Sequence, residues 1–253
     1  MGKLPVIKSL WVGGEISTME KMCIKSFLKN GHDFHLYTYE RVKGVPNNSE
    51  VKDAKKVIPK EKLNEFQNKE RLAIFADLFR YRLLQKRGGV WVDMDMICLR
   101  PFNFYDEIVI GSERTERSRW ELRLPSKAIN SVMVLPKKSK IAKYCYEKCK
   151  KMNLKKVEWG KTGPDLVQEA VEKLGYEESI VPFWYFCPVS WWKWNRFIDD
   201  SVKVRLVEYT KQKVLRPYSY HLWNSRWTMN NAEKEKIYPE NTIYGSLQRQ
   251  LLY

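Results

Sequence analysis

The sequence predicts an α/β fold in which one Rossmann-like mixed sheet is flanked by helices, with a smaller subregion beside it. The order of strand, helix and strand within residues 4–39 is typical of a parallel nucleotide-binding sheet. A later helix stops at Gly88-Gly89 and passes directly into an apolar strand. A chain of 253 residues suffices for one hydrophobic core, so we expect a single domain over residues 1–253.

The chain opens with an apolar segment over residues 4–12, which predicts the first strand. Ser17 and Glu20 then have the spacing of a capping box, so a helix is expected to begin there. Residues 32–39 predict the second strand. No G-x-G-x-x-G sequence follows the first strand, and a dinucleotide is therefore disfavoured.

The functional prediction depends on residues 71–101. Apolar residues recur there at helical spacing, and Asp77 and Arg80 share one face of the expected helix. After the glycine pair, alternation along a strand predicts that Asp93 and Asp95 project from the same side, about 7 Å apart. Two adjacent carboxylates repel each other unless a cation lies between them, and oxygen ligands suit Mg²⁺ or Mn²⁺.

An isolated D-x-D sequence is more often part of a solvated edge strand than of a metal site. Here Met94 and Met96 and the apolar residues on both sides predict a buried strand. Unpaired carboxylates would be costly in such a strand, so a bound cation is the better interpretation.

The remaining elements follow from similar signals. Apolar runs predict strands at residues 108–110 and 128–135, and periodicity predicts a helix at residues 139–152. Pro164 and Gly175 mark the beginning and the end of another helix.

The order Asp77-x-x-Arg80, Gly88-Gly89, Asp93-x-Asp95 resembles the signature of the glycosyltransferases with a DXD sugar-binding region, family 32 of the sugar-transferase classification. It is more distantly similar to the glucosylating domain of the large clostridial toxins. The resemblance implies a GT-A type fold, with the donor-binding part in residues 1–110 and the acceptor-side and closing segments in residues 111–253. It also implies metal-dependent, retaining transfer of a hexose or N-acetylhexosamine from a UDP-sugar to a glycan acceptor.

The resemblance gives five residues a role at the reacting end of the donor. Asp95 would be the catalytic metal ligand, and Asp93 and His221 would complete the protein ligands of Mn²⁺ or Mg²⁺. Asp77 and Arg80 would contact the donor sugar and its phosphate. The alternative for His221 is an ordinary histidine of the core.

Further donor contacts are also implied by the resemblance. Trp11 matches a tryptophan that stacks on uracil in the similar toxins, although Lys8 stands where the family has a histidine. Asn130 matches an asparagine near the donor sugar, and Ser225 and Trp227 resemble a segment that closes over the donor. The alternatives are a core position for Trp11 and an ordinary turn for Asn130.

The acceptor side is expected in the second half of the chain. Gly163 lies in a T-G-P sequence that resembles a family element at a helix start, and Asp165 follows as the carboxylate to watch for catalytic assistance. Trp184 and Trp191 belong to an aromatic-rich stretch whose flat faces suit sugars. The alternative for that stretch is a buried strand through Phe186 with a tryptophan-rich loop covering the core.

The charge balance favours a polyanionic partner. The chain has 46 Lys plus Arg against 30 Asp plus Glu, a net charge of +16. With interleaved aromatic residues, this leaves a single-stranded nucleic-acid-binding protein as the alternative function. The acidic pair would repel phosphate without a metal and no RNA-binding motif is present, so we expect no nucleic acid partner. A phosphoryl-transfer enzyme is a weaker option, since no P-loop or kinase signature appears.

The same features bound the location of the protein. No signal peptide is evident, and five cysteines without a C-x-x-C pair indicate reduced thiols in a cytoplasmic protein. The longest apolar run is too short to span a bilayer, and residues 230–253 predict a basic, amphipathic peripheral helix. A protein peripheral to the inner face of an anionic membrane, acting on a lipid-linked oligosaccharide in surface polysaccharide biosynthesis, fits this pattern.

Overall fold

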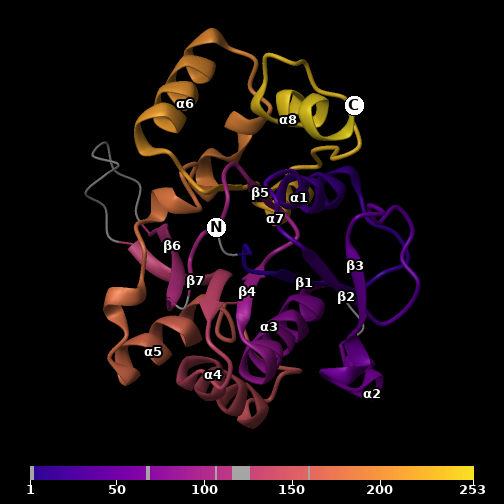
Figure 1. The fold of residues 1–253 in the computed structure, drawn as a ribbon, viewed down its shortest axis with the longest axis vertical. Helices are drawn as coiled ribbons and strands as arrows, with labels where there is room; N and C mark the ends of the chain where they lie inside the picture. Colours follow the sequence, from indigo (N-terminus) through magenta and orange to yellow (C-terminus); the bar gives the residue numbers. More distant parts are fainter. Residues whose placement is uncertain (1–2, 67–68, 106, 116–125, 159) are drawn as a thin grey trace.

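The structure, a computed structural model, describes residues 3–66, 69–105, 107–115, 126–158 and 160–253. Its main sheet has the strand order β3-β2-β1-β4-β7-β6 (Figure 1). The strands are β1 (Ile7–Trp11), β2 (Phe34–Thr38), β3 (Glu50–Asp53), β4 (Gly89–Val92), β6 (Val109–Arg114) and β7 (Ser126–Leu135). The first four pair in parallel, whereas β7 is antiparallel to both β4 and β6. The predicted mixed α/β sheet is confirmed.

Helices cover both faces of the main sheet (Figure 1). The helices are α1 (Thr18–Lys29), α2 (Lys60–Leu63), α3 (Lys69–Arg87), α4 (Lys140–Lys151), α5 (Pro164–Leu174), α6 (Val202–Leu215), α7 (Asn224–Met229) and α8 (Ile243–Leu252). A second sheet pairs the short strands β5 (Met96–Cys98) and β8 (Ser219–His221). On one face of the main sheet, α3 lies against β1 and β4 and packs on α4, while α5 packs on β7. On the other face, α1 contacts β2, β5 and α8. The described residues also include the 3₁₀ helices η1 (Ala54–Lys56), η3 (Glu177–Ser179), η4 (Phe183–Tyr185) and η5 (Trp191–Phe197).

Side-chain alternation along the strands divides the core into two clusters. Val90 and Val92 of β4 pack with the α1 side, and Trp91 between them packs with the α3 side. The ring centroid of Trp91 lies 6.4 Å from that of Phe79 on α3. The apolar stripe that predicted this helix thus buries itself against the strand that follows it.

The strand order creates a switch point at the carboxyl end of β1. β1 is hydrogen-bonded to β2 on one side and to β4 on the other, so the chain order of the strands runs outward from β1 in both directions. In open α/β sheets, ligands bind outside the carboxyl ends of the strands at such a switch point. Trp11 is the last residue of β1, and Asp93 directly follows β4.

Two interpretations of the second half of the chain are wrong. The alternative of a buried strand through Phe186 fails, because Ile180 makes only an isolated bridge with Ile110 and Phe183–Tyr185 form the 3₁₀ helix η4; Pro182 lacks the N–H group that a ladder needs. The C-terminal tail is not peripheral: α8 docks on α1, and Tyr244 is completely buried.

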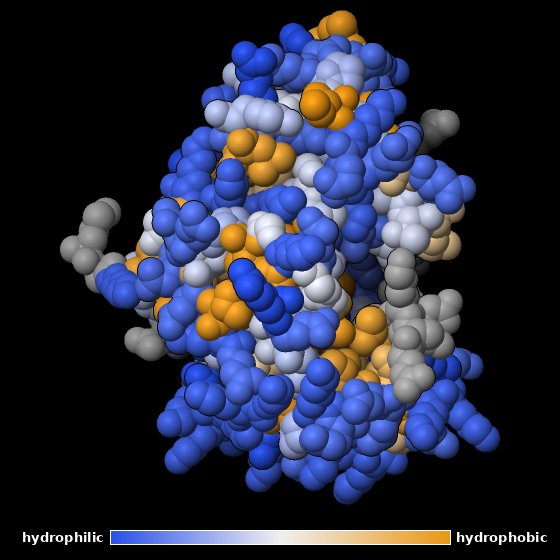
Figure 2. Space-filling model, turned by 90° about the vertical axis from the view of Figure 1, so that its right-hand side faces the viewer, coloured by the Kyte–Doolittle hydropathy of each residue, from blue (hydrophilic) through white to orange (hydrophobic). Residues whose placement is uncertain are grey.

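The face of the molecule in Figure 2 is mostly hydrophilic. On the face in Figure 2, hydrophilic side chains are nearly continuous at the lower end, and apolar side chains form separate groups above. Among the helices of the described residues, none has both the length and the hydropathy needed to cross a bilayer.

Replacement of Gly88 tests the stop between α3 and β4. Gly88 has φ +60°, and a Cβ atom there would lie 2.4 Å from the Lys137 backbone nitrogen. Gly88→Ala should lower the free energy of unfolding by about 2 kcal/mol or more, measured by urea denaturation. Gly14→Ala is the control, because a Cβ at Gly14 meets no atom within 4 Å. Equal effects of the two substitutions would contradict this account.

Candidate active site

The two aspartates of the D-x-D sequence lie in a turn. The Asp93 N–H donates to the Ser131 carbonyl at 2.9 Å, and the Met96 N–H donates back to the Asp93 carbonyl at 3.2 Å. The chain turns here because Met96 enters the second sheet and pairs with His221. The expected strand alternation of Asp93 and Asp95 is therefore wrong, and both residues stand beyond the carboxyl end of β4.

A buried arginine connects α3 to this turn. Arg80 is 4% exposed, and its guanidinium lies 3.0 Å from Asp93 Oδ1 and 3.2 Å from Asp77 Oδ1. The Arg80 Cζ atom also lies 4.9 Å from the centroid of the Trp91 ring. The Trp91 indole N–H donates to Asp93 Oδ1 at 2.9 Å. One cation thus serves two carboxylates and fixes the orientation of Asp93.

Asp77 joins three elements behind the turn. It accepts a 2.7 Å hydrogen bond from Thr162 Oγ1 and another of 2.7 Å from Asn130 Nδ2. The backbone carbonyl of Asn130 accepts a hydrogen bond from Arg80. Burial raises the pKa of Asp77, and the charge of Arg80 and the hydrogen bonds from Thr162 and Asn130 oppose the rise. A Cβ at Gly163 would lie 3.2 Å from both Asp77 and Asn130, so a side chain there would press on the network.

Asp95 is held from the other side, by β8 and α7. Its Oδ2 accepts from the Asn224 N–H at 2.8 Å and lies 3.3 Å from His221 Nε2. Burial acts to raise the pKa of Asp95, but the His221 charge and the two hydrogen bonds lower it. The pKa of His221 is raised because Asp95 outweighs its burial, so the imidazolium form is favoured. His221 also stacks on Trp223, with a ring-centroid separation of 3.8 Å.

The donor set suits a hard divalent cation that shares its ligands with a phosphate. The described residues contain no group of three or more His, Cys, Asp or Glu side chains arranged to hold a metal ion. Mg²⁺ normally takes only one or two carboxylates and completes its shell with phosphates and water. The ion pairs described above use Oδ1 of Asp93 and Oδ2 of Asp95, and the Asp93 side chain remains 30% exposed. His221 as a third ligand stays a prediction, since its Nε2 faces Asp95 here.

Trp11 stands at the carboxyl end of β1, half-buried. Its indole N–H donates to the Glu15 carbonyl at 3.1 Å, and a Cβ at Gly13 would contact the indole nitrogen at 3.4 Å. The glycine thus lets the backbone pass close to the ring. The ring is held in one orientation, with part of its surface accessible.

Trp227 is not at the surface of the site. It is completely buried, its indole N–H donates to the Leu222 carbonyl at 2.8 Å, and its ring packs 4.5 Å from that of Tyr244. Trp227 therefore does not reach a donor in this structure, because α7 turns the residue into the core that α8 covers. Ser225, in the first turn of α7, is exposed.

The acceptor-side residues are dispersed. Asp165 lies in the first turn of α5 and pairs with Lys127 and, at 3.0 Å, with Lys161; these partners lower its pKa. Trp184 and Trp191 are both half-buried, and the Arg226 guanidinium lies 4.1 Å over the Trp191 ring. 

Glu113 on β6 is an acidic neighbour of the site that the sequence did not indicate. It pairs across the sheet with Lys127 of β7. Burial raises the pKa of Glu113, while the charges of His221, Lys127 and Arg226 oppose the rise. A glutamate within a charged stretch carries no spacing signal of its own, so the sequence could not indicate its interaction with His221.

Removal of the buried guanidinium should destabilise the fold. Arg80→Gln leaves Asp77 and Asp93 without their shared cation, so the free energy of unfolding should fall by about 3 to 5 kcal/mol. Arg87→Gln, in the exposed last turn of α3, should change it by less than about 1 kcal/mol. Urea denaturation of both variants measures the difference. A loss in Arg80→Gln as small as in Arg87→Gln would contradict the role assigned to this cation.

Two family models match the chain. Residues 17–115 match "Glycosyltransferase sugar-binding region containing DXD motif", and residues 134–251 match "Alpha 1,4-glycosyltransferase conserved region". No curated protein matches. Among solved structures, the chain is similar to the PaToxG glycosyltransferase, with 14% identity over 98% of this chain and 87% of that one and a TM-score of 0.45.

It is also similar to the UDP-bound glycosyltransferase domain from the YGT toxin, with 8% identity over 97% of this chain and 82% of that one and a TM-score of 0.42. The first family model includes α3, the glycine pair and the D-x-D turn, and the second includes β8 and α7. Residues 17–115 therefore carry a glycosyltransferase region with the DXD sugar-binding motif, and residues 134–251 carry a second glycosyltransferase region.

Proposed function

We propose that the protein transfers a hexose or N-acetylhexosamine from a UDP-sugar to a glycan acceptor, with Mn²⁺ or Mg²⁺ as cofactor and with retention at the anomeric carbon. The observation that carries the proposal is the pair of carboxylates beyond β4, each braced through one oxygen by a different cationic group. The family match favours sugar transfer over the nucleic-acid-binding alternative.

Asp93 and Asp95 would hold the metal ion, which when bound would neutralise the negative charge that develops on the leaving UDP. Arg80 and the Trp91 N–H orient Asp93, and the Asn224 N–H and His221 orient Asp95. Carboxylates fixed before the ligand arrives need little reorganisation during the reaction.

Donor recognition is proposed for the residues around the turn. Trp11, at the neighbouring strand end, would stack on the uracil. Asp77 would accept hydrogen bonds from sugar hydroxyls, and the Asn130 amide would donate to or accept from them, through the lone pairs and protons not used in the hydrogen bond between the two residues. Exposed Ser225 would approach the diphosphate.

The acceptor would lie on the side of α5 and η5. Gly163, Trp184 and Trp191 are the proposed contacts, because a glycine admits a close approach and tryptophan faces suit sugar rings. A same-face displacement needs no dedicated protein base. Asp165 and Glu113 are the carboxylates to test for assistance. A lipid-linked glycan of a cell-surface polysaccharide, met at an anionic membrane surface in the cytoplasm, would match the net charge of +16.

The first test is UDP release from a panel of UDP-sugars, with and without Mn²⁺. One donor should be hydrolysed in a metal-dependent manner, and Asp95→Asn should reduce its kcat/KM by about 100-fold or more. The matched control is Asp200→Asn at an exposed position, which should keep full activity. Because hydrolysis without an acceptor is slow, a negative result is followed by calorimetry of UDP with Mn²⁺. Failure of UDP to bind in a metal-dependent way would overturn the proposal.

Substitution of Trp11 tests the nucleobase contact separately. Trp11→Ala should raise the Kd of UDP by about 5- to 100-fold, the range expected for loss of one stacked base, and Trp11→Phe should retain most of the affinity. The internal control is pyrophosphate with Mn²⁺, whose Kd should not change because it has no base. Parallel losses for UDP and pyrophosphate would show that Trp11 acts only through the fold.

A further inference from the structure

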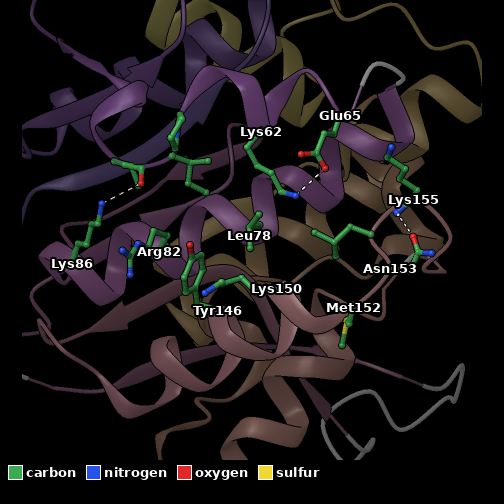
Figure 3. Close-up of a pocket in the computed structure, with 14 residues that line it drawn as sticks. Lys62, Glu65, Leu78, Arg82, Lys86, Tyr146, Lys150, Met152, Asn153 and Lys155 are labelled. Carbon is green, nitrogen blue, oxygen red and sulfur yellow. Dashed lines mark hydrogen bonds and ion pairs between the residues drawn. The ribbon is translucent and has the colours of Figure 1, made fainter.

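A second pocket lies away from the D-x-D turn, between α2, α3 and α4 (Figure 3). Its volume is 590 Å³, within the range of about 300 to 1,000 Å³ that is typical of small-molecule sites. The pocket is lined by basic, apolar and aromatic side chains, among them Ile58, Lys62, Leu78, Arg82, Lys86 and Tyr146.

Helix α3 separates this pocket from the active site. Leu78, Arg82 and Lys86 recur at steps of four and therefore share one stripe of the helix. Asp77 and Arg80 lie on a different stripe, which faces the D-x-D turn. The same helix thus presents one cationic side chain to the catalytic carboxylates and two others to the second pocket.

The pocket has a large excess of positive charge. Five basic side chains line it against one acidic side chain, Glu65, which is paired with Lys62 at 2.8 Å. Within the described part of the chain, Arg82, Lys86 and Lys155 form no ion pair with a carboxylate. Burial lowers the pKa of Lys86, and the charges of Arg82 and Arg87 lower it further.

Two of these cations are held in position by an aromatic ring. The Arg82 guanidinium lies 4.8 Å from the centre of the Tyr146 ring, and Lys150 Nζ lies 5.5 Å from it (Figure 3). Lys86 donates to the Val57 carbonyl at 3.2 Å, which keeps its ammonium at the pocket. The buried side chains of Ile58 and Leu78 provide an apolar lining.

We propose that this pocket is a second ligand site, separate from the catalytic centre, for a molecule that carries clustered phosphate groups. Several cations converge on one concave space, with few acidic groups to neutralise them. Arg and Lys form short, charge-assisted hydrogen bonds with phosphate oxygens, and bound phosphates would relieve the mutual repulsion of the cations. The apolar lining allows for an organic body attached to the phosphates.

Calorimetry with tripolyphosphate in the presence of EDTA tests the site, because the metal-free D-x-D turn repels phosphate. Arg82→Gln/Lys86→Gln should weaken the Kd by at least about tenfold. Lys143→Gln/Lys151→Gln is the matched control, since it removes the same charge from exposed positions of α4 outside the pocket, and it should change the Kd by less than about twofold. Equal losses in the two variants, or no binding by the unmodified protein, would overturn the proposal.

A second variant separates loss of binding from misfolding. Lys150 lines the pocket from α4, and glutamine at this position preserves helix propensity. Lys150→Gln should weaken tripolyphosphate binding without changing the Kd of UDP with Mn²⁺. Loss of both ligands together would place tripolyphosphate at the catalytic centre and overturn the proposal. Vesicles containing phosphatidic acid separate the sources: binding that needs Arg82 and Lys86 assigns a lipid headgroup, and binding of tripolyphosphate alone assigns a soluble phosphate ester.

Discussion

The structure of the candidate active site depends on the buried guanidinium of Arg80. A single cation lies within 3.2 Å of Asp77 and Asp93, and its ring contact with Trp91 ties it to β4. Buried carboxylates without such a partner would be expelled or protonated. The helix that brings Arg80 to this place therefore does more than cover the sheet, because it makes an acidic site possible at the strand end.

A second balance of charge operates at Asp95. His221 and the Asn224 N–H both stabilise its ionised form, and they come from a strand and a helix more than 100 residues farther along the chain. The two aspartates are thus braced by separate parts of the fold, one by α3 and the other by β8 and α7. Residues from both family regions, 17–115 and 134–251, therefore contact the D-x-D turn.

The distribution of charge differs between the two pockets of interest. At the D-x-D turn, the cationic side chains Arg80 and His221 are each paired with nearby carboxylates. At the pocket between α2, α3 and α4, cations outnumber anions, and no metal is needed to attract phosphate. A net charge of +16 reports neither arrangement, since it only counts residues.

Local sequence signals determined the elements that carry the site. The apolar stripe and the glycine pair predicted α3 and its stop, and the spacing of Ser17 and Glu20 predicted a capping contact that is present at 2.7 Å. Pro164 and Gly175 likewise delimit α5, with Gly175 in the left-handed region at φ +71°. Such signals act over one or two helical turns, within the reach of a single segment.

Only the tertiary structure decided which side chains meet. The turn at Asp93 arises because the chain leaves the main sheet after β4 and β5 pairs with β8. No local sequence pattern specifies this change of sheet. Trp227 and His221 are six residues apart, yet one enters the core and the other pairs with Asp95. Burial and ion pairing depend on contacts between segments that are distant in the chain. The spacing of residues therefore predicted which chemical groups form the candidate site, and tertiary packing determined where each of them lies.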